Sequence, residues 1–169
     1  MTSNRIVRNA LAAVGRIRIP ASESASVSTA SHDLSRHELL SAVRQHRQDV
    51  ARGMAAVADL IRKAGESHDH TKIERFRDYY RYFSQAQKTG IKSWDWCREI
   101  HAKQERHHIE DWFSDDVNLI DVLEHIVDGV MAGIGRSGEY RPDPPPVGLL
   151  EKAYANTQKL IASMVERKN

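Results

Sequence analysis

Acidic side chains without basic neighbours mark one segment late in the chain. On a helical wheel of about 100° per residue, residues 118–135 divide into an apolar half and a half that carries the acids. The second half comprises Asn118, Asp121, Glu124, His125, Asp128, Gly129, Ala132 and Gly135. A solvated helix face normally mixes both signs of charge, but this segment has no Lys or Arg. The pattern therefore favours acids that face a cation over acids that face water.

Histidine is the second residue type that gathers in this sequence. The chain has 9 histidines among 169 residues, and most of them lie between His68 and His125. Imidazole nitrogens and carboxylate oxygens are common ligands of divalent metal ions. The single cysteine, Cys97, excludes an intramolecular disulfide and a Cys-rich zinc site, and it fits a reducing cytoplasm. A metal ion would therefore be held here by His and carboxylate side chains.

Two candidate ligand sites precede the middle of the chain. His46 lies on the apolar stripe of a predicted helix, where it points toward the core. Taken alone, it also fits a core histidine that binds nothing. His68 and Asp69 are adjacent at the entry to the next predicted helix, so their side chains can diverge around one ion.

A third predicted helix adds more imidazoles. His101 and His108 are seven residues apart, so on a helix they share one face, together with Glu105. His107 projects to the side of that face. We expect at least one of these three histidines to face the metal cleft.

The elements that position these residues are predicted to be helices. Pro and Gly are sparse and the apolar residues recur at helical spacing, which indicates an all-α fold. A Thr71–Glu74 capping box begins the second helix, Gly65 ends the first, and Thr89-Gly90 ends the second. The five main helices are expected over residues 35–64, 71–89, 93–113, 115–136 and 148–166.

Composition divides the chain into an arm and one domain. Residues 1–32 are rich in Arg and Ser and have no acid before Glu23, which predicts a flexible arm or, alternatively, an organellar transit peptide. Residues 33–169 are long and apolar enough for one helical domain. The 25 basic and 23 acidic residues, net charge +2, argue against nucleic acid or anionic lipid as a bulk partner. No run is apolar enough to span a membrane.

The order of the candidate ligands resembles that of a known superfamily. His46, then His68-Asp69, then further histidines and an acid on a late helix resemble the HD superfamily of metal-dependent phosphohydrolases. More narrowly, residues 40–137 resemble a little-characterised HD-like family of bacteriophages and bacteria. The motifs that carry this similarity are His68-Asp69-His70-Thr71-Lys72, His101 with Arg106-His107-His108-Ile109-Glu110-Asp111-Trp112, and Glu124-His125-Ile126-Val127-Asp128. His125 departs from the usual hydrophobic residue at its position.

The resemblance implies a compact HD-type bundle with a metal site. The implied ligands are His46, His68, Asp69 and either Asp128 or Asp121, of which Asp128 is favoured because it lies one turn from Glu124. They would hold one divalent ion, or two, drawn from Mn, Mg, Co, Fe and Zn. Such an ion lowers the pKa of a bound water, which then attacks the phosphorus of a small phosphorylated substrate, first of all a nucleotide.

The same resemblance implies roles for other residues. Lys72 is the first candidate to neutralise charge on the phosphoryl oxygens, and Arg136 the second, although Arg136 also fits a simple cation at a helix C-terminus. His101, His107 and His108 would complete a second metal site, bind the phosphate or protonate the leaving oxygen. Glu124 would orient a water or a histidine.

Two other functions fit the same residues. The extra histidines favour an HD-type di-iron oxygenase slightly, and a non-catalytic helical protein with a closed structural metal site is the third reading. We expect a protein of the bacterial or phage-infected host cytoplasm. A homodimer is compatible with the sequence.

Overall fold

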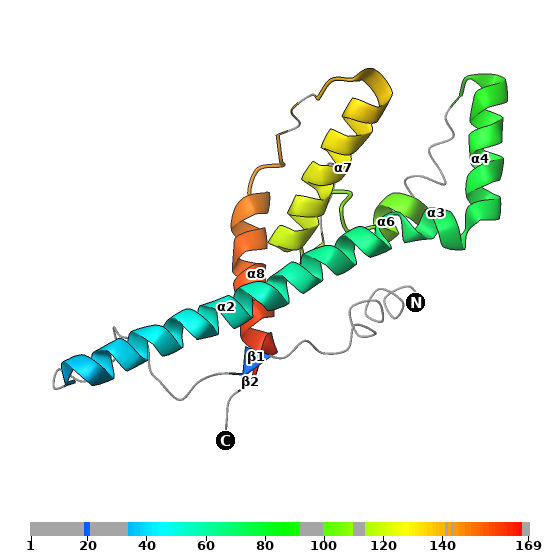
Figure 1. The fold of residues 1–169 in the computed structure, drawn as a ribbon. Coiled ribbons are helices and arrows are strands. Elements are labelled where there is room, and N and C mark those ends of the chain that lie inside the picture. The colour runs from blue at the N-terminus through cyan, green and yellow to red at the C-terminus, as the bar shows by residue number, and fades with distance from the viewer. Residues whose placement is uncertain are drawn as a thin grey trace. The chain divides into compact units, whose positions relative to one another are not determined.

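The computed structural model of the chain describes residues 19–20, 34–91, 100–109, 114–140, 142 and 144–166. In these ranges the long helices are α2 (Arg36–Ser67), α4 (Phe76–Thr89), α7 (Leu119–Ser137) and α8 (Leu149–Met164) (Figure 1). The short helices are α3 (His70–Glu74) and α6 (Ala102–Gln104). Strand β1 (Ile19–Pro20) pairs in parallel with β2 (Val165–Glu166). The prediction of an all-α fold is confirmed, with this two-stranded pairing as its only strand content in the described residues.

Two compact units divide the chain. One consists of residues 1–60 and 158–169, and the other of residues 61–157. The predicted domain of residues 33–169 spans both units. Of the predicted arm, residues 1–32, only Ile19 and Pro20 are among the described residues. No helix in the described part of the chain is both long enough and apolar enough to cross a membrane.

Helix α2 begins where the sequence predicts and ends later. Ser35 and Glu38 form a capping box, in which the Glu38 carboxylate accepts from the Ser35 backbone N–H at 2.8 Å. The predicted stop at Gly65 is wrong, because the helix continues to Ser67. A glycine inside a helix costs only about 1 kcal/mol relative to alanine, so it does not end one by itself. His46 is exposed on α2, so the prediction that it points into the core is also wrong.

The predicted second helix is two helices with a break at Arg75. Arg75 has φ −112° and ψ 33°, which separates α3 from α4. The capping box predicted at Thr71 does not form, because the Thr71 hydroxyl is bonded to the His101 ring and its N–H to Glu105. The predicted end of α4 is confirmed by Gly90, whose φ of 70° lies in the left-handed region.

The predicted third helix over residues 93–113 is wrong over residues 105–109. Residues 92–99 and 110–113 lie outside the described residues, and α6 covers only Ala102–Gln104. Glu105 is extended, with φ −91° and ψ 125°. A turn follows, in which the His108 N–H donates to the Glu105 carbonyl at 3.4 Å, and Glu105, His107 and Ile109 are buried.

Helix α7 begins at Leu119, four residues after the predicted start, because Asn118 and Asp121 form a capping box. Its predicted end near Gly138 is confirmed. The acidic half of α7 faces the histidine segments of its own unit, and large apolar side chains of the other half are more than half exposed: Ile126, Val127, Met131 and Ile134.

Helix α8 supplies the other side of the small apolar core of residues 61–157. Leu149 and Ala153 are fully buried and cluster with Ile109, Val117 and Val122. Asn156 donates to the carbonyls of Asp115 and Val117 at 2.8 and 2.9 Å, which fixes the loop before α7. This core holds the start of α7 beside the segment that carries His107.

Candidate metal centre

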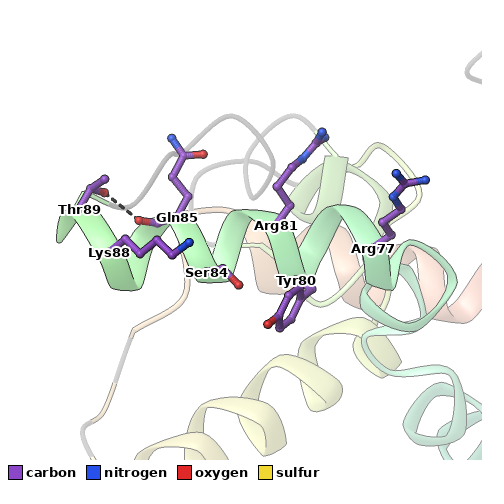
Figure 2. Close-up of a pocket in the computed structure, with 7 residues that line it drawn as sticks. All are labelled: Arg77, Tyr80, Arg81, Ser84, Gln85, Lys88 and Thr89. Carbon is purple, nitrogen blue, oxygen red and sulfur yellow. Dashed lines mark hydrogen bonds between the residues drawn. The ribbon is translucent and has the colours of Figure 1, made fainter.

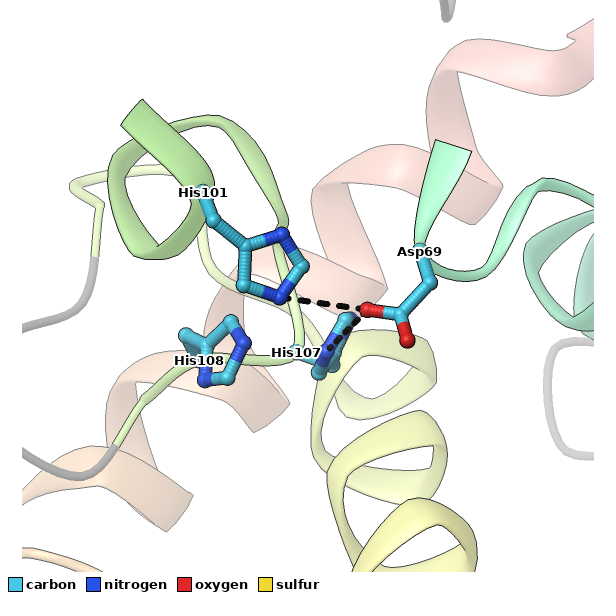
Figure 3. A group of neighbouring side chains, drawn as sticks. All are labelled: Asp69, His101, His107 and His108. Atoms are coloured by element: carbon cyan, nitrogen blue, oxygen red, sulfur yellow. Dashed lines mark ion pairs between the residues drawn. The ribbon is translucent and has the colours of Figure 1, made fainter. Parts of the chain in front are cut away.

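Four side chains converge in the unit of residues 61–157. Asp69, His101, His107 and His108 each offer one ligand atom, and these atoms lie within 4.8 Å of one another (Figure 3). Asp69 comes from the turn before α3, His101 from the N-terminal end of α6, and the other two from the turn segment after α6. We call this set the four-member group.

A second set shares one of these histidines. His68, His107 and Asp128 also offer ligand atoms within 4.8 Å of one another, and we call them the three-member group. The His68 Nε2 atom lies 3.5 Å from Asp128 Oδ1, and the His68 and His107 ring centroids are 4.3 Å apart. Asp128 projects from α7, so the two groups together join α7, the turn before α3 and the segment after α6.

The ligand groups contain buried polar atoms that lack aligned hydrogen-bond partners among the described residues. Asp69 Oδ1 and both ring nitrogens of His107 are buried without an aligned hydrogen-bond partner among the described residues. Leaving a buried polar atom unpaired costs on the order of 1–3 kcal/mol. The Asp69 Oδ1 atom lies 3.1 Å from His101 Nε2 and 3.8 Å from His107 Nε2. A cation between these atoms would satisfy them together, so the residues present fit a metal ion.

Protonation states favour ion binding in the four-member group. Burial acts to raise the carboxyl pKa of Asp69, but contacts with His101 and Lys72 outweigh it and hold that pKa well below its usual range. The pKa of His101 is lowered by burial and by the charges of Lys72 and His108, despite the contact with Asp69. Near neutral pH, Asp69 is therefore ionised and His101 is neutral, as metal ligands must be.

Negative charge dominates around the three-member group. Burial acts to lower the pKa of His68, but hydrogen bonding to Glu124 and the charges of Asp69 and Asp128 raise it. Burial acts to raise the pKa of Glu124, but contacts with His107 and His68 lower it, so Glu124 is ionised. The raised pKa of His68 shows that the surrounding carboxylates favour a cation at this place.

Two residues without a predicted role order the ligands. The Glu105 side chain is 4% exposed, accepts a hydrogen bond from the Thr71 N–H at 2.8 Å and lies 2.9 Å from His70 Nδ1. The Thr71 hydroxyl in turn lies 2.7 Å from His101 Nδ1, so its hydrogen bond orients the His101 ring toward Asp69. The signal for Glu105 was present in the sequence as an acid four residues after His101.

Asp121 belongs to neither group. Its carboxylate accepts from Arg106 Nε at 2.8 Å and from Arg106 Nη2 at 2.7 Å, and it also caps α7. Burial raises the pKa of Asp121, although the Arg106 contacts oppose this. Of the two acids that competed for the last ligand position, the structure therefore brings only Asp128 beside His68.

Three other predicted site residues, Lys72, His46 and Arg136, lie on three different helices. Lys72 pairs with Asp69 Oδ2, on the other side of the carboxylate from His101. His46 lies in the other compact unit and belongs to neither group. Arg136 is exposed at the end of α7 and donates from Nε to the Ala132 carbonyl at 3.1 Å, which agrees with its reading as a C-terminal cation.

A hollow of about 530 Å³ lies along α4 and contains no member of either group (Figure 2). It carries three cationic side chains, Arg77, Arg81 and Lys88, together with Tyr80, Ser84, Gln85 and Thr89. All of these residues come from one helix and most are exposed, so the hollow is a shallow surface feature.

Comparison with known proteins gives one match. The model of a family of unknown function, DUF5662, matches residues 35–166, a range that includes both ligand groups. No curated protein and no solved structure matches the chain.

Proposed function

We propose that this chain, which belongs to the DUF5662 family of unknown function, is a metal-dependent phosphohydrolase for small phosphorylated metabolites. The observation that carries the proposal is the cluster of buried, unsatisfied ligand atoms on Asp69 and His107. The resemblance to the HD superfamily supplies the reaction class. It also makes nucleotides the first substrates to test.

The donor set favours a transition metal. Imidazole nitrogens suit Zn, Fe, Co and Mn better than Mg, which prefers oxygen ligands and water. Both groups combine histidine with carboxylate, a donor set that such ions bind. A bound ion would supply the nucleophile by lowering the pKa of a water molecule.

His107 belongs to both ligand groups, and this sharing leaves a coordination position open for a reaction. Structural sites use four protein ligands, whereas catalytic sites keep one position open. The His107 Nδ1 atom faces Glu124 at 3.1 Å, so only Nε2 remains to bind an ion, and His107 can serve one group at a time. The three-member group therefore has at most three protein ligands, and only the four-member group can reach four. The side chains of His68 and Asp128 are 27% and 39% exposed, which lets a substrate reach the three-member group.

Lys72 is the residue best placed to bind the phosphoryl group. Its ammonium pairs with Asp69 Oδ2, and its side chain is 31% exposed. An ammonium at the rim of the ligand cluster can contact phosphoryl oxygens and stabilise the charge that grows on them. Asp69 therefore links the metal ligands to the proposed substrate-binding cation.

Metal analysis and a phosphate-release screen test the proposal. The purified protein should contain a transition metal and release phosphate from nucleotides with Mn, Co, Fe or Zn. Asp69→Ala should lose both properties, because it removes a ligand of the four-member group. Asp115→Asn is the matched control, since Asp115 is exposed and pairs only with Lys152 among the described residues. Metal-free wild-type protein, or an Asp69→Ala variant that keeps metal and activity, would refute the site.

A di-iron oxygenase is the second candidate, because four of the six ligand residues are histidines. It predicts that the iron-loaded protein consumes dioxygen and releases no phosphate. An oxygen electrode and a phosphate assay on one iron-loaded sample separate the two reactions. Tightly held metal with neither activity would instead support a structural site.

A further inference from the structure

Glu124 lies between the two ligand groups and touches a histidine of each. Its Oε1 atom lies 3.0 Å from His68 Nδ1 and 3.1 Å from His107 Nδ1. The His68 contact is an aligned hydrogen bond, whereas the His107 contact has the distance without full alignment. The Glu124 side chain is 14% exposed, so water screens these contacts little.

These contacts decide which ring nitrogen of each histidine faces the metal site. A neutral imidazole carries one N–H and one lone pair, and an ionised carboxylate can only accept. Beside Glu124, Nδ1 therefore carries the proton, and Nε2 keeps the lone pair that a metal ion needs. The Nε2 atoms of His68 and His107 are the ones that face Asp128 and Asp69, respectively.

Helix α7 holds Glu124 in place. The helix is capped at both ends, by the Asn118–Asp121 box and by Gly138. Asp128 follows Glu124 by four residues, so the helix fixes the ligand and the acceptor one turn apart. The next residue, His125, has its Nδ1 atom 2.9 Å from the His107 carbonyl, so α7 contacts both the backbone and the ring of His107.

We propose that Glu124 is a positioning residue that fixes the Nδ1–H tautomer of both His68 and His107, and so preforms both ligand groups. The inference rests on the proposed metal centre. Glu124 belongs to neither ligand group, and its Oε1 atom contacts two imidazoles. Removal of the carboxylate should therefore weaken both groups, although it removes no ligand.

The first experiment is performed on ion-free protein. Long-range ¹H–¹⁵N NMR spectra of the histidine rings distinguish the two tautomers, and His68→Gln and His107→Gln assign the signals. At a pH above the raised pKa of His68, the wild-type spectrum should show Nδ1–H tautomers for both residues. In Glu124→Gln, the amide has one acceptor oxygen and adds two donors, so at least one ring should change to the Nε2–H tautomer. Unchanged tautomers in this variant would refute the proposal.

The second experiment measures Zn²⁺ and Mn²⁺ binding by isothermal titration calorimetry. Glu124→Gln should weaken each bound ion by about 10- to 100-fold. Asp128→Asn should weaken only the three-member group, and His108→Gln only the four-member group. Glu151→Gln, an exposed glutamate on α8, is the matched control and should bind as wild type does.

The outcomes separate this inference from the proposed function. If wild-type protein binds no ion, the metal centre fails, and the tautomers of the ion-free protein still test Glu124. If wild type binds and Glu124→Gln binds equally well, the centre stands and the role of Glu124 fails. Circular dichroism checks the fold of each variant. Should Glu124→Gln not fold, Glu124→Asp, which keeps the charge but shortens the side chain, takes its place with the same expected losses.

Discussion

At the scale of single residues, His107 has the most constrained environment in the site. Its side chain is 2% exposed, and its ring contacts the rings of His68, His101 and His108. Three imidazoles around a fourth would repel one another if they were charged. A metal ion binds imidazole rings only while they are neutral. Binding of an ion by this cluster should therefore depend on a pH near neutral.

The Arg106–Asp121 pair should be a major source of stability. Arg106→Ala leaves the Asp121 carboxylate 4% exposed and without its guanidinium partner, and should cost about 3 kcal/mol at pH 7. Burial already raises the pKa of Asp121, and the loss of Arg106 would raise it further. The protonated carboxyl is tolerated better in the folded state, so the deficit should shrink as pH falls toward 5. Urea denaturation at both pH values measures this.

Arg81→Ala provides the comparison for Arg106→Ala. The Arg81 side chain is 80% exposed and pairs with Asp78 at 3.3 Å, so its removal should cost at most about 1 kcal/mol at either pH. Equal costs for the two substitutions, or a deficit of Arg106→Ala that grows at low pH, would contradict this account of the pair.

Residue types and adjacency predicted part of the site. His68, Asp69 and Asp128 were chosen as ligands from an adjacent pair and an acidic helix face, and the structure brings them close together. His46 was chosen because it lies on an apolar stripe, but such a stripe does not show whether a residue reaches a site or water. Glu105 stands out in the sequence as an acid four residues after His101, but no local pattern pairs it with Thr71 or Thr71 with His101, because these partners are 34 and 30 positions apart.

At the scale of elements, the start of α7 is the point where the fold and the site depend on one another. Asn118 accepts from the Ile120 N–H at 2.9 Å, and its own N–H donates to Asp121 at 2.9 Å. Asn118→Ala should therefore destabilise the protein by about 1 kcal/mol, seen as a lower midpoint of thermal unfolding.

The matched control for Asn118→Ala is Gln87→Ala on the exposed surface of α4, which should leave the midpoint nearly unchanged. A loss in the Asn118 variant no larger than in this control would show that the cap contributes nothing.

Helix ends were predictable where a glycine adopts the left-handed conformation. Gly90 and Gly138 end α4 and α7 as expected, with φ of 70° and 73°. Gly65 has no such conformation, and α2 passes through it. The segment after α6 was predicted as helix because His101 and His108 are seven residues apart. The structure brings their ring centroids to 4.7 Å by a different path, through the extended Glu105 and the turn that follows it.

At the scale of the whole molecule, the ligand groups join segments that are far apart in the sequence. A metal ion that binds the folded state alone stabilises it by mass action. With free Zn²⁺ at about 100 times its dissociation constant, the expected gain is about 2.7 kcal/mol, or about 5–10 °C in the unfolding midpoint. Differential scanning fluorimetry with and without a chelator measures the shift.

Asp69→Asn is the control for this stabilisation, because it has nearly the same shape but no carboxylate charge. Its unfolding midpoint should hardly respond to Zn²⁺. An equal rise in both proteins would show that the ion binds elsewhere.

The helical class of the molecule followed from composition and spacing, but its internal organisation did not. Apolar residues at helical intervals predict helices without telling which half of each helix is covered. In α7 the acidic half faces the histidines, and the apolar half is largely exposed. The division into two compact units likewise falls inside α2 and α8, where the sequence offers no break.

Asp69 is the one non-glycine residue with positive φ among the described residues, at 57°. This backbone conformation suits glycine better than any residue with a β-carbon. Asp69→Gly should therefore relieve the backbone, but it also removes the carboxylate that pairs with Lys72 and contacts His101. Under the proposed function, the aspartate occupies this backbone position because of the ion that it would bind.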